Sequence, residues 1–491
     1  MSVSNRPLNA ARWLGKELGL NTMKSAGKDV YIVILARYIR LFAYGAVALV
    51  LAVYLKELGF TDEQIGLFMT LTLLGDVFVS LLLTLIADSL GRRRILLFGA
   101  VAMAISGAVF ATTDSYIALL LAAIIGVISP SGNEIGPFRA VEESTLAHLV
   151  SEHQRSDVYT WYVVLAVLGT STGLAVGGVA VDQLQTREGW TELDAYRAVF
   201  WIYTGVGCIK AVMTLFLSPQ CEHKDWAKVV ETSGETEPLL DGNGSLNGVE
   251  SSSQRSPPPK STKRFWHSIS TISKPSRLVL LKLCGLFFFD SLGSGMVPFS
   301  LINYYMERKF HLPKGELGGI MSATWFVSTI GNMFAASLAK RLGLIQAMVF
   351  THLPSSIFLA LLPAPPGLPL TICLLVGRSV LNSMDQAPRS AFLSIVVLPE
   401  ERTAVMGVVN ILKTLSQSSG PSVTGVLAGR DHFWVAFVVA GSLKAAYDLM
   451  LLAFFGGRVQ QQKHDASEVE EEDDEYTETD TGVNVTDRPE E

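Results

Sequence analysis

Two acidic residues lie inside long apolar segments of this chain, where a charged side chain is costly. Asp76 is near the middle of the segment 64–87, and Asp290 lies in a glycine-rich part of a later apolar segment. Because desolvation disfavours an ionised carboxylate, such a group can take up and release a proton near neutral pH. Both residues are therefore candidates for carrying a coupled proton. The alternative is a structural ion pair with a basic residue such as Arg40.

Polar side chains recur at helical spacing in two other apolar segments. Residues three, four and seven positions apart lie on one face of an α-helix. One such face carries two arginines and a tyrosine, and the other carries two amides with Lys413 between them. Lys413 would then hold an anionic substrate or neutralise Asp290. We predict that the two faces line a substrate cavity, and its candidate residues are Arg37, Arg40, Tyr44, Asn410, Lys413 and Gln417.

Charged residues also gather at the ends of two apolar segments. Asp385 and Arg389 lie near the end of one segment, and Glu134 and Arg139 follow the end of another. Opposite charges that meet when helix ends approach can close a passage. We therefore predict an inner gate at these four residues, with a set of solvated helix ends as the alternative.

The apolar segments that must position these residues dominate the composition. Apolar residues make up 49 % of the chain and charged residues only 17 %, a pattern typical of multi-span membrane proteins. A span needs about 20 mostly apolar residues. The segments that meet this criterion are 30–55, 64–87, 94–113, 116–134, 158–182, 197–218, 277–303, 317–340, 344–363, 368–388, 404–428 and 433–456.

Polar segments flank and divide the expected spans. We predict a cytoplasmic leader at 1–29, a six-helix bundle at 30–218, a disordered cytoplasmic linker at 219–275, a second six-helix bundle at 276–456 and an acidic disordered tail at 457–491. Lys and Arg concentrate on the side of the leader and linker, so the positive-inside rule places both termini in the cytoplasm. The tail accounts for the net charge of −6, and no basic, base-reading helix indicates nucleic-acid binding.

The two halves of the chain repeat each other in parallel. One constant shift lays Gly66 on Gly318 and Gly91 on Gly343. Two repeated six-span halves are the architecture of a rocker-switch transporter, with the substrate site near the midplane between the halves. We therefore expect an all-α membrane protein with twelve transmembrane helices in two pseudo-symmetric six-helix bundles.

The loop after the second span reads Asp88-Ser-Leu-Gly91-Arg92-Arg93. It resembles the signature loop of the major facilitator superfamily, and the resemblance covers both bundles but not the leader, linker or tail. It implies the major facilitator fold and a gating role for the loop. Asp88 would pair with a neighbouring arginine and with the N-terminus of the eleventh span near Thr403, and so lock the cytoplasmic side in an outward-open state. The alternative is simple anchoring of the loop by its arginines.

Small residues recur in the fifth span and at the matching place in the eleventh. The glycines of the fifth span resemble the antiporter motif of the same superfamily, with Leu174 at the place of its proline. The resemblance implies proton-driven export. The alternative is ordinary helix packing, because small residues let helices approach closely. The residues concerned are Gly169, Gly173, Gly177, Gly178, Gly420 and Pro421.

These features favour a proton-coupled secondary transporter that exports a small organic molecule by alternating access, similar to the multidrug efflux antiporters of the superfamily. An importing symporter or facilitator of a nutrient or anion is one alternative, and a non-transporting membrane sensor is another. We expect no enzyme activity, cofactor or metal, because the sequence has no catalytic set, phosphate loop or metal cluster. The expected partners are the substrate, protons and the lipid bilayer, without nucleic acid, and the expected state is a monomer.

An acidic dileucine pattern, Glu235-Thr-Glu-Pro-Leu239-Leu240, lies in the expected linker. Such patterns are typical of delivery to the vacuole or lysosome. We therefore expect a multi-pass protein of the plasma membrane or of the vacuolar or lysosomal membrane.

Overall fold

The computed structural model contains helices and no strands over the residues that it describes. These residues are 20–126, 128–130, 137–221, 274–385, 388–389, 392–393, 396–397 and 401–480. Most of the expected leader and linker lies outside them, as do the end of the tail, Glu134 and the dileucine pattern.

The first half of the chain forms one bundle. Its long helices are α3 (Lys28–Glu57), α4 (Asp62–Leu90), α5 (Arg92–Thr112), α8 (Glu152–Gln185) and α9 (Glu192–Leu215). Its shorter elements are α2 (Leu20–Ser25), α6 (Tyr116–Gly126), α7 (Pro137–Leu149) and the 3₁₀ turn η1 (Pro219–Cys221).

The second half forms the other bundle. Its helices are α12 (Lys274–Met296), α13 (Phe299–Phe310), α14 (Lys314–Leu342), α15 (Leu344–Leu361), α16 (Leu368–Met384), α18 (Arg402–Gly429) and α19 (Phe433–Asp480). Among the described helices, seven are long and apolar enough to cross a membrane by length and composition: α3, α5, α8, α9, α12, α15 and α19.

Two of the expected spans are interrupted helices. The expected span 277–303 is divided between α12 and α13 at Val297 and Pro298. Proline lacks a backbone N–H and disfavours helical backbone in the residue before it, which explains this break. The expected span 116–134 ends as a helix at Gly126. Discontinuous helices are typical of transporter cavities, because their free backbone groups face a cavity rather than lipid.

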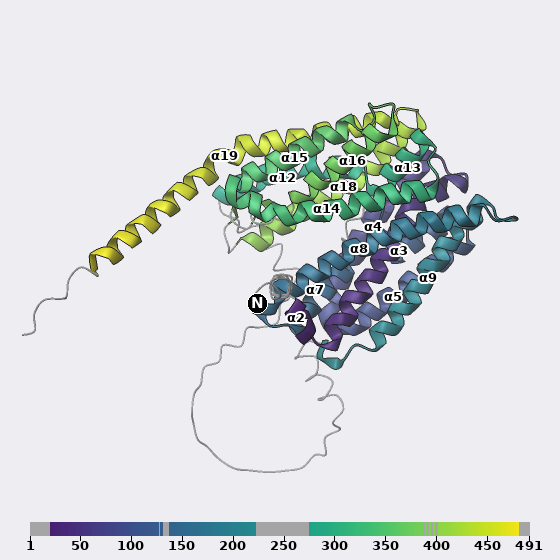
Figure 1. Cartoon of the computed structure of the whole chain (residues 1–491), viewed down its shortest axis with the longest axis horizontal. Helices are drawn as coiled ribbons and strands as arrows, with labels where there is room; N and C mark the ends of the chain where they lie inside the picture. Colours follow the sequence, from purple (N-terminus) through teal and green to yellow (C-terminus); the bar gives the residue numbers. More distant parts are fainter. Residues whose placement is uncertain are drawn as a thin grey trace, which may run out of the picture.

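The last helix extends beyond the expected span. A disordered tail was predicted from residue 457, whereas α19 continues as a helix to Asp480. Figure 1 shows this extension projecting away from both bundles. Of the 24 residues from 457 to 480, six are Glu and three are Gln, and both residue types favour helical backbone without a core to pack against.

The same helix pairings recur in the two bundles. α3 packs against α8 and α9 in the first bundle, as α12 packs against α18 and α19 in the second. Between the bundles, α8 packs on α14 and α18 packs on α4. The turns also correspond, since Gly91 after α4 has φ 90° and Gly343 after α14 has φ 92°, a region that glycine adopts without a side-chain clash. The fold therefore has the parallel repeat that the sequence predicts.

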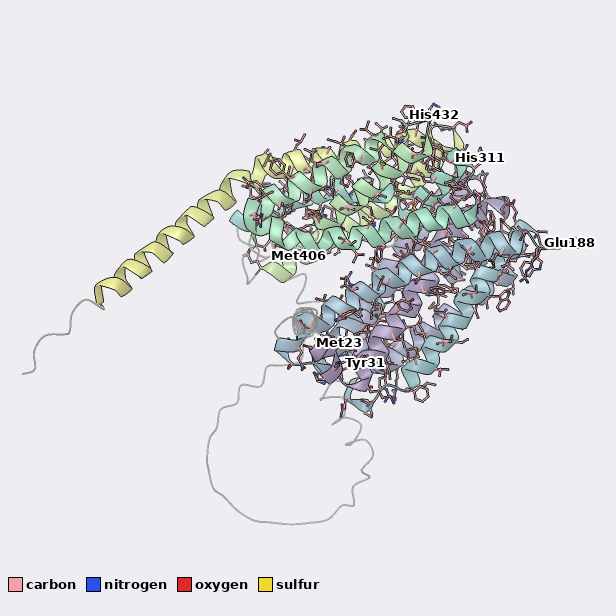
Figure 2. All side chains as sticks on the ribbon, viewed as in Figure 1. Met23, Tyr31, Glu188, His311, Met406 and His432 are labelled. Carbon is pink, nitrogen blue, oxygen red and sulfur yellow. The ribbon has the colours of Figure 1, made fainter. Side chains whose placement is uncertain are left out.

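The two bundles meet at one end of the molecule. Figure 1 shows the purple-to-blue and the green-to-yellow helices in contact there and diverging toward the chain termini. Figure 2 places Glu188, His311 and His432 at this joined end, and Met23 and Met406 at the other, which we call the terminal end. Hydrogen bonds join the bundles from Asn303 to Ala48, from α13 to Asp62, from Gly315 to Asp182 and from Ser422 to Thr70.

The first bundle starts and finishes at the terminal end. Asp29, in the first turn of α3, accepts a hydrogen bond from the backbone N of Ser218 at 3.0 Å, just after α9. Met23, Val30 and Cys221 share one apolar cluster beside this contact. The start and the end of the first bundle therefore lie on the same side, as an even number of crossings requires.

Glycines let the backbones of the two bundles touch. A β-carbon on Gly178 of α8 would lie 2.3 Å from the backbone oxygen of Lys314 in α14. A β-carbon on Gly425 of α18 would lie 2.5 Å from the backbone oxygen of Asp62 in α4. Both distances are too short for any residue that has a β-carbon. We call the contact of Gly178 with Lys314 the first glycine seam and that of Gly425 with Asp62 the second glycine seam.

A group of charged and hydrogen-bonding side chains also joins the bundles. Asp62 of α4 accepts hydrogen bonds from Tyr304 Oη at 2.8 Å and Arg308 Nη1 at 3.1 Å, both in α13. Arg308 Nη2 also pairs with Asp431 at 2.8 Å. We call these four residues the Asp62 latch, and it holds the joined end together because Asp62 belongs to the first bundle and its partners to the second.

Candidate functional site

Asp290 of α12 is buried in the second bundle between two cations. It accepts hydrogen bonds from Arg389 Nη1 and from Lys444 Nζ of α19, each at 2.7 Å. Arg389 also pairs with Asp385, one helical turn before it. The alternative partner considered from the sequence, Arg40, pairs instead with a glutamate of the first bundle. Asp290 is therefore paired within its own bundle.

A histidine connects Asp290 to a second buried acid. His352 of α15 has Nε2 3.6 Å from Asp290 Oδ1, and its Nδ1 is 2.9 Å from both carboxylate oxygens of Asp448. An imidazole can donate to one carboxylate when neutral and to two when protonated. His352 therefore lies between two buried carboxylates and is hydrogen-bonded to that of Asp448. The residues of this acid–base cluster are Asp290, His352, Asp385, Arg389, Lys444 and Asp448.

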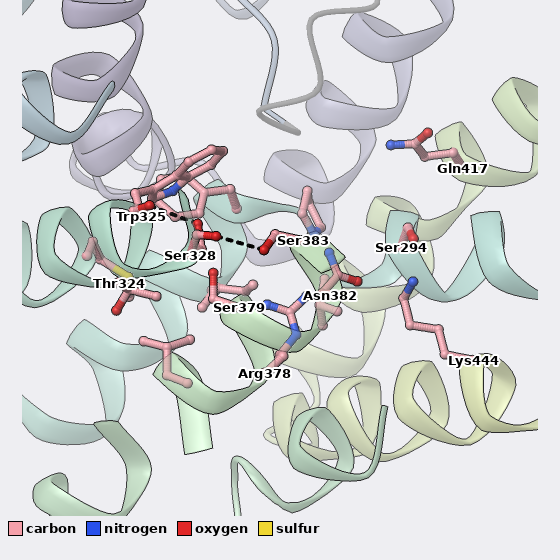
Figure 3. A pocket seen from close by; sticks show the side chains of 16 residues that line it. Ser294, Thr324, Trp325, Ser328, Arg378, Ser379, Asn382, Ser383, Gln417 and Lys444 are labelled. Carbon is pink, nitrogen blue, oxygen red and sulfur yellow. Dashed lines mark hydrogen bonds between the residues drawn. The ribbon is translucent and has the colours of Figure 1, made fainter. Parts of the chain in front are cut away.

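A cavity of about 190 Å³ lies beside the acid–base cluster. Figure 3 shows its lining side chains, which come from α12, α13, α14, α16, α18 and α19. The break between α12 and α13 places Val297 and Pro298 in its wall. Lys444 both lines the cavity and binds Asp290, so the cavity and the cluster share one cation.

The predicted cavity residues of α18 have three different surroundings. Gln417 lines the cavity. Lys413 places its Nζ 4.9 Å from the centre of the Phe287 ring, a favourable cation–π distance. Asn410 is exposed. Of the three, Gln417 therefore contacts the cavity directly.

The basic face of α3 lies in the first bundle. Arg40 Nη2 pairs with Glu142 of α7 at 2.9 Å, and Lys210 of α9 lies 3.4 Å from the same carboxylate. The Arg37 guanidinium lies over the Tyr162 ring at 3.8 Å. Glu142 is thus surrounded by cations, as Asp290 is in the other bundle. The cavity in the second bundle is not lined by Arg37, Arg40 or Tyr44, and their role in binding a substrate stays a prediction.

Asp76, the other proton-carrying candidate, has no cation partner among the described residues. It is 2 % exposed and is hydrogen-bonded with the Ser129 side chain. A carboxylate with one hydroxyl partner is costly to bury as an anion. Asp76 and Asp290 therefore lie in opposite electrostatic surroundings, although the same sequence pattern selects both.

The predicted gating loop lies at the terminal end. Asp88 is in the last turn of α4, Gly91 makes the turn, and Arg92 Nη1 donates to a backbone carbonyl oxygen of α7 at 3.4 Å. Arg93 follows in the first turn of α5. The contact of Asp88 near Thr403 lies outside the described side chains, so the gating role of this loop stays a prediction.

The inner-gate candidates that the structure describes do not meet one another across the bundles. Asp385 and Arg389 pair with each other in the second bundle. Arg139 pairs with Glu143 in α7 at 2.7 Å, and Glu134 lies outside the described residues. The bundles diverge at the terminal end, so these charges are paired within their own bundles, and the inner gate stays a prediction.

The glycines of the antiporter-like motif are all at helix contacts. Gly173 lies against α3, where a β-carbon would be 1.9 Å from the Phe42 oxygen. Gly420 lies against α12, where a β-carbon would be 2.2 Å from the Gly295 carbonyl carbon. The other members also touch neighbouring helices: Gly169 and Gly177 touch α3, Gly178 touches α14 and Pro421 touches α4.

Several residues of the site are not among the predicted coupling, cavity or gate residues. Four of them are polar residues in long apolar segments, which is the pattern that drew attention to Asp290, and Glu142 lies in the shorter, mixed helix α7. The pattern does not tell which of them share a cluster or a cavity, because their partners are on other helices. The residues are Glu142, His352, Arg378, Lys444 and Asp448.

Comparison with known sequences gives a family and two informative relatives. A sequence model of the Major Facilitator Superfamily matches residues 33–282 and 283–483. The uncharacterised membrane protein YJR124C of Saccharomyces cerevisiae is 35 % identical over 436 residues, which cover 88 % of this chain and 95 % of that protein. The quinolone resistance protein NorA of Staphylococcus aureus is 23 % identical over 190 residues, which cover 39 % of this chain and 45 % of that protein.

Solved transporter structures have the same architecture. The nucleoside transporter NupG is 14 % identical with a TM-score of 0.63, covering 87 % of this chain and 99 % of its own. A D-xylose–proton symporter is 13 % identical with a TM-score of 0.64, covering 87 % and 98 %. A bacterial homologue of the human lysosomal transporter Spinster, inward-facing and unoccupied, is 14 % identical with a TM-score of 0.57, covering 86 % and 94 %. At these identities the likeness shows the fold alone.

Proposed function

Because the chain belongs to the major facilitator superfamily, a family of secondary transporters, we propose that it moves a small organic molecule by alternating access, coupled to protons. The observation that carries this proposal is the position of Lys444. Its Nζ donates to Asp290 at 2.7 Å, and its side chain lines the cavity. A proton on Asp290 would weaken that ion pair and so change the charge that the cavity presents to a substrate.

We propose that the acid–base cluster, rather than Asp76, carries the coupled proton. The cluster supplies an acid, an imidazole and a second acid in sequence, and it adjoins the cavity through Lys444. Asp76 lies in the first bundle and faces Ser129. Asp76 remains a second candidate, because its uncompensated burial favours protonation over a buried negative charge.

Export in exchange for protons is the first candidate direction. It is supported by the resemblance to NorA, since resistance to a quinolone is what export of that compound would produce. The glycine motif that the superfamily's antiporters share also supports it. Proton symport is the second candidate, and Lys444 favours it for an anionic substrate. Protonation of Asp290 would leave Lys444 available to an anion, so proton and anion would bind together.

We further propose that the terminal end faces the cytoplasm, which makes the present structure an inward-facing state. The positive-inside rule supports this orientation. The two ends of the first bundle lie on one side, as they must if both face the cytoplasm. Residence in the plasma membrane or in a vacuolar or lysosomal membrane, and a monomeric state, are parts of the same proposal.

The test is accumulation of a panel of organic compounds in cells that lack or overproduce the protein, with and without a protonophore. Overproduction should change the accumulation of some compound, and the protonophore and Asp290→Asn should each abolish that change. Lower accumulation indicates export and higher accumulation indicates symport into the cell. Glu63→Gln is the control, because Glu63 is an exposed carboxylate at the start of α4.

Three outcomes separate the parts of this proposal. Transport that survives the protonophore would exclude proton coupling. Loss of coupling in Asp76→Asn, with Asp290→Asn unaffected, would move the coupling site to the first bundle. Absence of any change in accumulation over a broad panel would favour a sensor without transport activity.

A further inference from the structure

The cavity of the second bundle is lined by cations and by neutral hydrogen-bonding groups. Arg378 and Lys444 are its charged residues, and the residues that line it, all in the described part of the chain, include no carboxylate. Its neutral polar residues are Ser294, Thr324, Ser328, Ser379, Asn382, Ser383 and Gln417. A cavity of this composition is complementary to a negatively charged, hydrogen-bonding ligand.

Arg378 differs from the other charged residues of the second bundle. Arg389 and Lys444 both pair with Asp290, whereas the guanidinium of Arg378 has no ion pair among the described residues. The contact of this residue with Ser355 uses its backbone carbonyl oxygen. A guanidinium within a membrane-spanning bundle is costly without a counter-ion. Its presence in a cavity wall is explained if the counter-ion is a ligand.

The charges around the cavity leave a positive excess. Four cations and three carboxylates lie in or beside it, and the imidazole of His352 adds no negative charge. One cation is therefore uncompensated even when every carboxylate is ionised. The cations are Arg378, Arg389, Lys413 and Lys444, and the carboxylates are Asp290, Asp385 and Asp448.

The opposite wall of the cavity is aromatic. Trp325 and Phe299 both line it, with ring centroids 5.6 Å apart in an edge-to-face arrangement. Such rings provide a flat apolar surface for the uncharged part of a ligand. At about 190 Å³ the cavity holds a small molecule rather than a peptide or lipid.

We propose that this cavity binds a small organic anion and that Arg378 binds its carboxylate or phosphate. The planar guanidinium would form paired hydrogen bonds with two oxygens of the anionic group. The serines and amides would bind its hydroxyl or carbonyl groups, and Trp325 its apolar part. The inference rests on the proposed function in taking this cavity as the transport site, and it adds the chemical class of the substrate.

The test is ligand binding to the purified full-length protein in detergent, followed by thermal unfolding and by titration calorimetry. The probes are matched pairs of an anion and a neutral analogue: benzoate and benzamide, gluconate and glucose, and glycerol 3-phosphate and glycerol. All are compared at one ionic strength, since salt screens charge interactions. We expect at least one anion to bind saturably, and its neutral analogue to bind at least about tenfold more weakly.

Two variants of Arg378 and one control locate the site. Arg378→Gln should weaken binding of that anion by at least about tenfold, and Arg378→Lys should restore part of the affinity because it keeps the charge. Arg430→Gln should bind as the unchanged protein does, because Arg430 is an exposed arginine at the end of α18. Without ligand, Arg378→Gln should unfold at the same or a higher temperature, whereas an arginine needed only for folding would lower it.

The proposal is overturned if no anion of the panel binds, if neutral analogues bind as tightly as anions, or if Arg378→Gln leaves anion affinity unchanged. Binding in detergent needs no proton gradient. Failure of this inference is therefore distinguishable from failure of proton coupling, which appears only as protonophore-insensitive transport.

Discussion

At the scale of residues, each bundle buries one carboxylate between two cations. Glu142 contacts Arg40 and Lys210, and Asp290 contacts Arg389 and Lys444. Two cations can be buried side by side only while the carboxylate between them balances their charge, because two buried cations repel each other. The two carboxylates differ in one respect, since the partner Lys444 of Asp290 also lines the cavity. We therefore expect Glu142 to be structural, whereas the proposed coupling role belongs to Asp290.

Glu142→Gln should destabilise the protein strongly. The substitution keeps the size of the side chain but leaves its buried cationic partners without the charge that they share, at a cost of about 3–5 kcal/mol. Thermal unfolding of the purified protein measures the effect. Glu143→Gln is the matched control, because Glu143 pairs with Arg139 on a partly exposed face and that pair contributes about 0–1 kcal/mol. Equal losses in the two variants would contradict a structural role for Glu142.

Isolated charges in apolar segments can be found from the sequence, but their partners cannot. Asp290 was recognised in this way, and Asp385 and Arg389 were recognised as charges at the end of a span; all three lie in one cluster. Their contacts join helices that are far apart in the chain, so spacing along one helix gives no information on them. Periodicity on α18 selected Asn410, Lys413 and Gln417, and of these three Gln417 lines the cavity. An error of a few residues in the edge of a span is enough to cause such a difference.

At the scale of helices, glycines fix how closely neighbours pack. Gly173→Ala should destabilise the first bundle, because the new β-carbon would lie 1.9 Å from the Phe42 backbone oxygen and α8 would have to move away from α3. Overpacking of this kind costs about 1–3 kcal/mol, which thermal unfolding would detect. Gly205→Ala on α9 is the matched control, because nothing lies within 4 Å of its β-carbon position. A stability loss in the control as large as that of Gly173→Ala would show that the packing argument fails.

The positions of the helices were largely predictable, and their interruptions were not. Long apolar runs identify spans because a bilayer sets their minimum length. The apolar run through Val297 and Pro298 continues across the break, so composition does not show where α12 ends. The proline offered a signal that the apolar count ignores, since it removes a backbone donor. The helical extension of α19 was not predicted, because the high charge of the tail indicated disorder. Its Glu and Gln residues nevertheless favour helical backbone.

At the scale of the whole molecule, the Asp62 latch is one of the contacts that hold the joined end together. Asp62→Asn should shift the protein away from the present state, because the lost ionic hydrogen bonds to α13 favour the joined end by about 1–3 kcal/mol. A cysteine at Ser379 in the cavity, placed in a variant without the four native cysteines, reports the shift. Its labelling by a membrane-impermeant reagent from the terminal side should slow severalfold.

Asp114→Asn is the control for the latch. Asp114 pairs with Arg197 at 2.6 Å, and both residues belong to the first bundle. Loss of this pair leaves the contact between the bundles intact, so labelling should stay unchanged. Slower labelling in both variants would mean that the effect does not depend on a contact between bundles.

The first glycine seam allows α8 to pivot at one end. Gly178 lies at the joined end of this helix, and Glu152 begins it near the terminal end. The two residues are separated by about 39 Å of helix, so a turn of about 10° at the seam moves the far end by about 7 Å. Because Gly178 has no side chain at the seam, α8 can rotate there by that amount without separating interlocked side chains. A small rotation at one end of the molecule would thus be amplified into a passage at the other.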